Sequence, residues 1–168
     1  MREIQLTQGY VALVSDKDYQ RVSKFKWCVH ITRNKNGSVK SLYATRGVWL
    51  NGSCTARWLH RVILQVSNPK VKVDHKNRNG LDCRRSNLRA ATNSQNTSNT
   101  KLYSNSTSGL KGVAWNKQSK KWVAYIYADY KRIHLGYFTD KHEAAKIRDL
   151  AAKQYHKQFA VLNFKEKP

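Results

Sequence analysis

The 168-residue sequence has few acidic residues and no long apolar run, and both shortages narrow what the chain can be. It contains 10 Asp and Glu against 32 Lys and Arg, which gives a formal net charge of +22. No stretch of 18 apolar residues is present, so we expect no membrane-spanning helix. The opening MREIQLTQGY lacks the apolar run and cleavage site of a signal peptide, so none is expected.

The three cysteines exclude two kinds of stabilising framework. Cys28, Cys54 and Cys83 lie far apart in the sequence, and no CxxC pair occurs. Widely spaced thiols in an odd number predict neither a disulfide framework nor a four-ligand zinc site. They suit a reducing compartment, so we expect a cytoplasmic protein.

What the chain has in quantity is positive charge and aromatic side chains. Hydrophobic residues make up 40% of the sequence, with five Trp, nine Tyr and four Phe, which is enough for folded cores. The basic excess is spread over the whole length: residues 1–100 carry 18 basic and 5 acidic groups, and residues 101–168 carry 14 and 5. Such a balance indicates a polyanionic partner, most commonly nucleic acid.

Local patterns divide the chain into three stretches. Residues 4–58 are typical of short strands and turns, with a helical turn or two opening at Ser15 or Asp16 and an Asn51-Gly52 hairpin signal. A short helix near Trp58 should carry His60, Arg61 and Ile63. Residues 71–99 follow as a strand, a tight reversal at Asn79-Gly80, a returning strand and a polar helix.

The last stretch begins at Gly109, after a Ser-, Asn- and Thr-rich segment at 101–108 that we interpret as a linker. Three strands are expected over LKGVAW, KWVAYIYA and KRIHLGYF. A helix with Asp140 as its N-cap should follow, burying a stripe of Ala144, Ile147, Ala151 and Tyr155. This order predicts a sheet with one face covered by the helix.

The segment VDHKNRNGLDCRRSNLRAATNSQN contains an ordered set of polar residues. Asp74 precedes His75, an NxNG turn follows, Asn87 lies in SNLR, and Asn96 comes nine residues later. The set resembles the HNH nuclease motif, in the phage homing-endonuclease branch in which Asn replaces the last His. The upstream stretches ALVSDKDYQRVSKFKW and LHRVIL also resemble N-terminal regions of phage HNH proteins, so the resemblance covers essentially the whole chain.

These residue types suit phosphodiester hydrolysis, which needs an activated water and positive charge near the leaving oxygen. His75 suits the role of general base because its ordinary pKa lies near neutrality. Asp74 and Asn96 offer oxygen ligands for a hard divalent ion, Mg²⁺ or alternatively Mn²⁺. The resemblance further implies a ββα-metal fold with the ion between hairpin and helix, in which Asn87 braces the hairpin loop and orients His75.

Each of these residues also has a purely structural alternative. His75 could be a surface turn histidine, and Asp74 could simply form an Asx turn. Asn93 and Asn99 compete with Asn96 in the same polar helix, whose spacing favours Asn96. Zinc is disfavoured, because the sequence has no cluster of thiolates and imidazoles.

Basic residues around this motif are candidate phosphate contacts. His60 could contact a phosphate or serve as an auxiliary group, and a half-buried helix histidine is the equal alternative. A solvated basic face is the alternative for each arginine taken alone, but not for the set. The arginines expected to contact phosphates are Arg61, Arg78, Arg84, Arg85 and Arg89.

Residues 108–164 resemble the plant ethylene-response-factor, or AP-two, DNA-binding domain. KGV, KKW, the alternating AYI, LGYF, EAA, the Asp-x-Ala-Ala of the helix and the closing VLNF fall in the family's order. The resemblance implies a three-stranded sheet in the major groove with the helix packed behind it. Alternation along the strands then predicts that Trp122, Ala124, Ile126 and Leu135 face the helix, and that Tyr125, Tyr127 and His134 face DNA.

The sequence departs from the plant pattern at the groove-reading positions. Ala114, Asn116 and Tyr127 replace arginines, His134 replaces a tryptophan, and Lys111 keeps a positive charge. We therefore expect a different target sequence; the alternative is that the tyrosines merely cover an exposed sheet. The residues expected to contact DNA in this part are Lys111, Asn116, Lys117, Lys121, Tyr125, Tyr127, Arg132 and His134.

The sequence therefore predicts an α+β protein. A β-rich endonuclease domain at 1–100 contains a ββα-metal core at about 58–99. A linker at 101–108 joins it to a DNA-binding domain at 109–168, a three-stranded antiparallel sheet packed on one helix. The expected activity is metal-dependent cleavage of double-stranded DNA, leaving 5′-phosphate and 3′-hydroxyl ends. By the same resemblance, the chain would be phage- or intron-encoded and act in the cytoplasm of a bacterial host; no membrane partner is expected. A monomer would nick one strand and a dimer could cut both, and the sequence leaves both open.

Two other functions stay open at this stage. A DNA-binding regulator with a vestigial nuclease site would share the charge and the second domain, although the set of Asp74, His75, Asn87 and Asn96 argues against it. An RNA-binding accessory protein is supported by charge alone.

Overall fold

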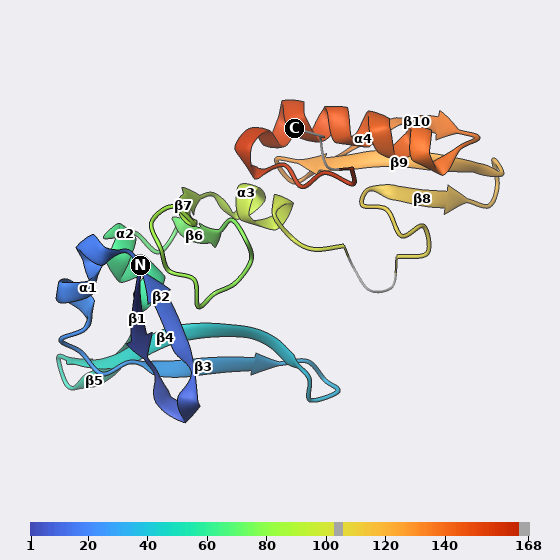
Figure 1. Cartoon of the computed structure of the whole chain (residues 1–168). Coiled ribbons are helices and arrows are strands. Elements are labelled where there is room, and N and C mark those ends of the chain that lie inside the picture. The colour runs from blue at the N-terminus through green and yellow to red at the C-terminus, as the bar shows by residue number, and fades with distance from the viewer. Residues whose placement is uncertain (103–105, 165–168) are drawn as a thin grey trace. The chain divides into compact units, whose positions relative to one another are not determined.

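The computed structural model describes residues 1–102 and 106–164 and divides the chain into two compact units, Met1–Thr92 and Asn93–Pro168 (Figure 1). The division falls earlier in the chain than the expected linker at 101–108, of which residues 103–105 lie outside the described residues. Within the described residues the fold is α+β, with small antiparallel sheets and short helices. None of the described helices has the length and apolar character needed to cross a membrane.

The first unit contains three sheets. The pairs β1–β2 and β6–β7 form two-stranded sheets, and β4 is the central strand between β3 and β5. The elements are β1 (Arg2–Gln5), a 3₁₀ turn (Thr7–Gly9), β2 (Val11–Val14), α1 (Asp16–Val22), β3 (Cys28–Arg33), β4 (Val39–Leu50), β5 (Ser53–Trp58), α2 (Leu59–Leu64), β6 (Lys72–His75) and β7 (Leu88–Ala91).

The local signals of the first unit are confirmed in two places. The helix α1 begins directly after Ser15, as the N-cap pattern predicts. The β4–β5 hairpin turns at Asn51 and Gly52, whose φ angles of 49° and 77° are those of the tight turn that an Asn-Gly step favours.

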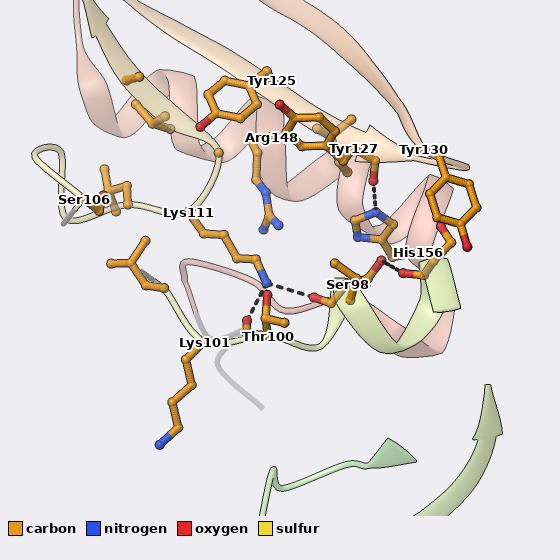
Figure 2. A pocket seen from close by; sticks show the side chains of 18 of the residues that line it. Ser98, Thr100, Lys101, Ser106, Lys111, Tyr125, Tyr127, Tyr130, Arg148 and His156 are labelled. Carbon is orange, nitrogen blue, oxygen red and sulfur yellow. Dashed lines mark hydrogen bonds between the residues drawn. The ribbon is translucent and has the colours of Figure 1, made fainter. Parts of the chain in front are cut away.

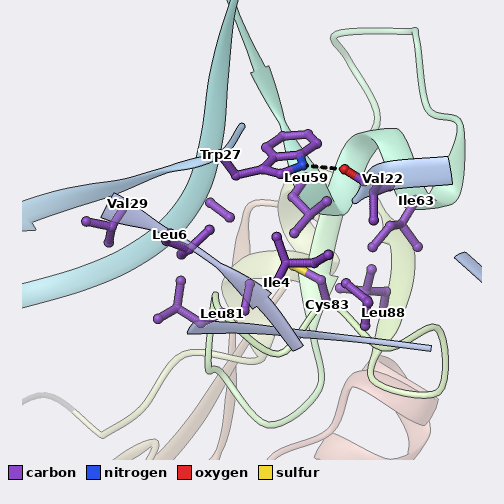
Figure 3. Close-up of a cluster of buried hydrophobic side chains, with 13 residues drawn as sticks. Ile4, Leu6, Val22, Trp27, Val29, Leu59, Ile63, Leu81, Cys83 and Leu88 are labelled. Atoms are coloured by element: carbon purple, nitrogen blue, oxygen red, sulfur yellow. Dashed lines mark hydrogen bonds between the residues drawn. The ribbon is translucent and has the colours of Figure 1, made fainter. Parts of the chain in front are cut away.

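The first unit packs around Trp27, whose indole is 1% exposed and whose Nε1 donates a 2.9 Å hydrogen bond to the Val22 carbonyl oxygen (Figure 3). Leu59 and Ile63 of α2 lie in the same core and are fully buried. Because α2 has only six residues, its own hydrogen bonds cannot stabilise it, and tertiary packing must hold it in place.

A buried carboxylate ties the end of α2 to α1. Asp18 is 2% exposed and bonds both Arg21 Nη2 and Arg85 Nη2 at 2.9 Å. The same two arginines donate to the carbonyls at the end of α2, Arg21 to Val62 at 2.9 Å and Arg85 to Ile63 at 2.8 Å. The two arginine side chains, held by Asp18, therefore donate to carbonyls at the end of the helix.

The second unit is a three-stranded sheet, in the order β10-β9-β8, packed on one long helix (Figure 1). Trp122, Ala124, Ile126 and Leu135 pack toward the helix, as strand alternation predicts. Its elements are α3 (Asn93–Ser98), β8 (Val113–Asn116), β9 (Lys121–Ala128), β10 (Lys131–Phe138), α4 (Lys141–His156) and a closing 3₁₀ turn (Lys157–Phe159).

The start of α4 is as predicted, and its buried face is not. Asp140 caps the helix by accepting a 2.9 Å bond from the His142 backbone nitrogen. The expected stripe included Ile147 and Tyr155, but these are 36% and 45% exposed. The face of α4 that is buried consists of small and polar side chains instead. Its residues are Ala144, Ala145, Ala151 and Ala152, together with Arg148, Asp149 and His156. Small side chains let the helix approach the sheet closely, which the apolar period alone does not reveal.

We expect Asp18→Asn to destabilise the first unit by about 2–4 kcal/mol, because it leaves two arginine side chains partly buried without their carboxylate. Urea unfolding at neutral pH measures the loss. The matched control is Asp16→Asn: Asp16 is an exposed residue of the same helix, so solvent screens its ion pairs and the loss of stability should be much smaller. Equal losses for the two variants would contradict the role assigned to Asp18.

The stability difference between wild type and Asp18→Asn should depend on pH. Burial raises the pKa of Asp18, but the bonds from Arg85 and Arg21 outweigh it and hold this pKa below the ordinary 3.8. The carboxylate therefore stabilises the fold above pH 3.8, and its contribution is lost as pH falls through the lowered value. The stability difference between wild type and Asp18→Asn should shrink in that acidic range, and a difference that grew there would be contradictory.

Candidate functional site

The β6–β7 hairpin presents Asp74 and His75 at the end of a strand. In the antiparallel register Asp74 lies opposite Arg89, and His75 lies opposite Leu88. Asp74 and His75 are each 5% exposed. Neighbours on a strand point to opposite faces, so both sides of this short hairpin are covered.

Arg89 compensates the buried carboxylate from the facing strand. Its Nε donates to Asp74 Oδ2 at 2.7 Å, and its Nη2 lies 2.7 Å from the same oxygen. The Arg89 side chain is itself only 12% exposed. A buried charge is tolerated only with such a partner, so the cross-strand pair is a condition for burying Asp74.

His75 lies among aromatic rings contributed by β4, β5 and α2. The His60 ring centroid is 5.1 Å from that of His75 in an edge-on arrangement, and the Tyr43 ring is 5.8 Å away. Trp58 extends the cluster, with its ring 5.7 Å from Tyr43 and 6.0 Å from His60. The aromatic cluster, defined as Tyr43, Trp58, His60 and His75, thus fixes the imidazole on several sides.

Burial sets the protonation of both histidines in this cluster. It lowers the pKa of His75 to about 4, although the carboxylates of Asp74 and Asp82 act in the opposite direction. Burial, His75 and Arg61 lower the pKa of His60 to about 3. Burial and the Asp74 charge raise the pKa of Tyr43. At neutral pH the site therefore holds two uncharged imidazoles, and each is a weaker base than the near-neutral pKa of an ordinary histidine led us to expect.

Asn87 holds the loop between the two strands. Its Oδ1 accepts a 3.0 Å bond from the Asn77 backbone nitrogen, and its Nδ2 donates to Asn77 Oδ1 at 3.0 Å and to the Asp82 carbonyl oxygen at 2.8 Å. The Asn87 carbonyl oxygen accepts from Lys76 N at 2.9 Å. These bonds place Asn87 where a brace of the loop after His75 would lie.

The glycine in this loop is required for a different reason from the one its Asn-Gly step suggests. Gly80 does not have a positive φ; in this turn Arg78 has one, at 63°. A Cβ on Gly80 would lie 2.2 Å from the Leu42 carbonyl oxygen and 2.6 Å from the Tyr43 ring. The loop therefore lies directly against β4, beside a member of the aromatic cluster.

Most of the arginines expected to contact phosphates bond within the protein. Arg84 bonds the Asp82 carboxylate at 2.6 Å, and Arg85 bonds Asp18 at 2.8 Å. Arg61 donates to the carbonyls of Val71 and Asn68, each at 2.7 Å. Arg78 is exposed on the loop. A basic side chain in a sequence pattern therefore indicates charge but not whether that charge is available to DNA.

The oxygen donors suit a loosely held hard cation rather than a closed protein site. Within the described residues no group of three or more His, Cys, Asp or Glu is placed to hold a metal. Asp74 supplies one carboxylate, now neutralised by Arg89, and Asn96 is exposed on α3 in the second unit. One carboxylate completed by phosphate and water is a usual Mg²⁺ arrangement, so the residues fit that ion.

The second unit has an open sheet face that carries aromatic and basic side chains. Arg132 lies over the Tyr125 ring, with its guanidinium carbon 4.2 Å from the ring centroid. Tyr127 is 58% exposed and meets Tyr125 edge-on, and His134 is 4.7 Å from the ring of Tyr137. The open face, defined as Tyr125, Tyr127, Arg132, His134 and Tyr137, thus brings together four residues that the sequence pattern named.

The other residues of this unit that were predicted to contact DNA differ in whether their side chains already have partners within the protein. Lys117 and Lys121 are exposed. Asn116 accepts bonds from the backbone nitrogens of Gln118 and Ser119, so its Oδ1 shapes the turn. Lys111 Nζ donates to the carbonyls of Ser98 and Thr100 at 2.8 and 2.6 Å. Of these three lysines, Lys111 is the one whose ammonium group bonds the backbone of its own unit.

The sequence did not predict the residues that surround His75 and its loop. Tyr43 and Trp58 come from strands far from the motif in sequence, and Asp82 and Asn77 were not among the candidates. A signal for Trp58 was available, since it directly precedes the helix that carries His60. No local pattern points to Tyr43, because its position depends on how β4 packs against the loop.

Comparison with known proteins adds four observations. A family model described as HNH endonuclease matches residues 57–98. A transcription factor of Arabidopsis thaliana named for its AP2/ERF and B3 domains is 37% identical over 60 residues, which is 36% of this chain and 17% of that protein. A second such factor from the same plant is 45% identical over 56 residues, 33% of this chain and 16% of that protein.

A phage protein also matches. Protein 3.8 of Escherichia phage T7 is 37% identical over 60 residues, which is 36% of this chain and 50% of that protein. The chain thus spans half or less of the length of each of these curated relatives. The residues matched by the HNH endonuclease model include Asp74, His75, Asn87 and Asn96, so the match and the buried hairpin fall on the same segment.

Proposed function

We propose that the chain is a metal-dependent endonuclease that cleaves double-stranded DNA at preferred sites. The observation that carries the proposal is the β6–β7 hairpin, on which the consecutive residues Asp74 and His75 are both buried within the segment that matches the HNH endonuclease model. The surplus of basic residues suits a DNA partner.

In the proposed mechanism His75 is the general base. Its uncharged imidazole takes a proton from water as the water oxygen forms a bond to phosphorus, and the bond from phosphorus to the 3′-oxygen breaks in line. The products are a 5′-phosphate and a 3′-hydroxyl. His75 is 5% exposed, so the attacking water has to enter with the phosphate rather than exchange freely with bulk solvent.

Asp74 would supply a carboxylate ligand to the divalent ion, Mg²⁺ or Mn²⁺, and the sequence motif predicts Asn96 as a further ligand. When bound, such an ion supplies positive charge to the phosphate and the leaving oxygen. Arg89 neutralises Asp74 before the ion arrives, and Asn87 keeps the loop that follows His75 in one conformation. A single site per chain would cut one strand at a time.

The second unit is proposed to direct cleavage to particular sequences. The support is the open face, where Arg132 stacks on Tyr125 and exposed Tyr127 and His134 extend the surface. Arginine and aromatic side chains together can contact phosphates and base edges. The relatives named as AP2/ERF transcription factors make a DNA-reading role reasonable for similar residues here.

We expect His75→Ala to lower the rate of plasmid nicking in Mg²⁺ by at least about 100-fold, because a positioned general base contributes that much or more. DNA binding, measured by gel shift, should change little. His142→Ala is the matched control, since His142 is exposed at the start of α4. Nicking by His75→Ala at the wild-type rate would remove His75 from the mechanism, and a wild type that never nicks would favour the vestigial-site alternative.

Asp74→Asn should raise the Mg²⁺ concentration needed for half-maximal nicking or abolish nicking, because the amide lacks the charge that attracts a cation. A metal titration of the nicking rate measures the effect, with EDTA as the zero point. Since Arg89 loses its partner in this variant, circular dichroism must show that the fold persists. A folded Asp74→Asn protein with an unchanged metal requirement would contradict the proposed ligand.

The double change Tyr125→Ala and Arg132→Ala should abolish site preference while nicking of unrelated plasmid continues. Sequencing of the cut ends from a mixed DNA pool measures preference directly. Lys141→Ala, an exposed change away from the open face, serves as the control. If the double variant cut the same sites in the same proportions, the open face would not be the reader.

A further inference from the structure

A cavity of about 520 Å³ lies within the second unit, apart from the β6–β7 hairpin and its aromatic cluster (Figure 2). It is walled by residues from α3 and the segment after it, from the ends of β8 and β9, and from α4. Its volume falls in the range of small-molecule sites, roughly 300–1,000 Å³. The nuclease mechanism does not use it, and it shares only Tyr125 and Tyr127 with the open face.

The wall of this cavity is positively charged. Among the described residues that line it are Arg148, Lys111 and Lys101, and none of the lining residues in this set is an aspartate or glutamate. Figure 2 shows the Arg148 guanidinium pointing into the space between Lys111 and His156. A concave site with one sign of charge favours a ligand of the opposite sign, so the cavity favours an anion.

Arg148 is buried to a degree that is unusual for an arginine, with 2% exposure, and this burial lowers its pKa. Within the described part of the unit, its Nε has no hydrogen-bond partner. Its Nη1 bonds Asp149 at 3.1 Å and the Val161 carbonyl oxygen. The guanidinium therefore retains donor capacity at the cavity.

The one carboxylate near Arg148 is shared with other donors. Asp149 Oδ2 accepts from the backbone nitrogens of Asn163 and Phe164 at 2.7 and 3.0 Å, and its Oδ1 accepts from Asn163 Nδ2 at 3.0 Å. Three donors besides Arg148 thus disperse the negative charge of Asp149. The positive charge of Arg148 is only partly compensated, which favours an incoming anion.

His156 provides a second buried polar group at the cavity. It is 9% exposed, and its Nε2 lies 2.7 Å from the Tyr127 carbonyl oxygen. In the part of the chain that the structure describes, its Nδ1 has no hydrogen-bond partner. A buried polar atom without a partner is costly, so a ligand that bonds it would be favoured.

The other walls suit a ring rather than a second charge. Tyr125, Tyr127 and Tyr130 line one side, with Leu110, Val113 and Ile126 as apolar neighbours. Tyr130 is 78% exposed and has a φ of 65°, a conformation that a bulky residue seldom adopts. A turn of this kind prefers Gly or Asn, so the tyrosine here indicates a use for its ring.

We propose that this cavity binds one nucleotide, with its phosphate bonded to Arg148 and its base stacked on Tyr130 at the mouth. Guanidinium groups bind phosphate through paired hydrogen bonds, and bases of any sequence stack on tyrosine. Ser94 and Thr97 of α3 line the same space, and the Thr97 hydroxyl, which donates to the Asn93 carbonyl oxygen, can accept a bond from a sugar hydroxyl. The nucleotide is either free or part of a strand, since both present the same chemistry.

The test is ligand-observed NMR on the full chain without Mg²⁺, using the deoxynucleoside 5′-monophosphates as probes. We expect binding at micromolar to millimolar concentrations, with the nucleosides and inorganic phosphate at least tenfold weaker. Inorganic phosphate that binds as well as the nucleotides would overturn the proposal, and so would the absence of binding by any nucleotide.

Two variants connect binding to this cavity. Tyr130→Asn should weaken binding by about tenfold because the stacking ring is lost, while the fold is kept or stabilised because Asn suits the turn. Arg148→Lys should weaken it by about tenfold, because lysine keeps the charge but lacks the paired donors. Tyr155→Asn, an exposed change on α4 outside the cavity, is the control. Wild-type affinity in a folded Tyr130→Asn protein would overturn the proposal.

A single-stranded oligonucleotide with a 5′-phosphate distinguishes the two sources of the nucleotide. If it displaces the mononucleotide from wild type, the cavity takes a nucleotide within a strand, and if it does not, the cavity takes a free nucleotide; either result supports the site. Because no cleavage is measured, failure of this proposal and failure of the nuclease proposal are distinguishable.

Discussion

The ion pair between Asp74 and Arg89 is the interaction on which the proposed site depends. A carboxylate that is 5% exposed would be too costly beside an uncharged His75 without a cation directly across the hairpin. The antiparallel register of β6 and β7 supplies that cation. Arg89 therefore holds the Asp74 side chain in place, and the guanidinium charge is what a divalent ion would have to replace.

The contacts around this ion pair fix the position of the His75 side chain. Asn87 bonds both ends of the loop that follows, and Gly80 lets that loop lie against β4. The aromatic cluster closes the remaining sides. An imidazole held in this way keeps one orientation, and a fixed orientation favours proton transfer at a defined position.

Much of the fold was predictable because its signals are local. The Asn-Gly hairpin, the caps at Ser15 and Asp140, and the strand alternation of β9 depend on neighbouring residues. The exposed face of α4 was predicted wrongly, since Ile147 looks like a core residue until alanines on an overlapping stripe pack closer to the sheet. Tyr43 and Asp18 could not be predicted, because their contacts join segments distant in sequence.

The sequence likewise does not reveal which arginines are available to bind DNA. Arg85 and Arg21 bond Asp18 and the end of α2, while Arg78 is exposed on the loop, although all are equivalent in a count of charge. Whether a basic side chain is available to DNA depends on the carboxylates and carbonyls that the fold brings to it. A net charge of +22 predicts the class of partner but not the residues that touch it.

The proposed function requires that the hairpin carrying Asp74 and His75 hydrolyse DNA. Mapping the ends of the products on both strands, after incubation with phage or plasmid DNA in Mg²⁺, measures this. We expect breaks at defined positions, each with a 5′-phosphate and a 3′-hydroxyl, that disappear in EDTA. Intact DNA, or breaks that end in a 3′-phosphate, would contradict it.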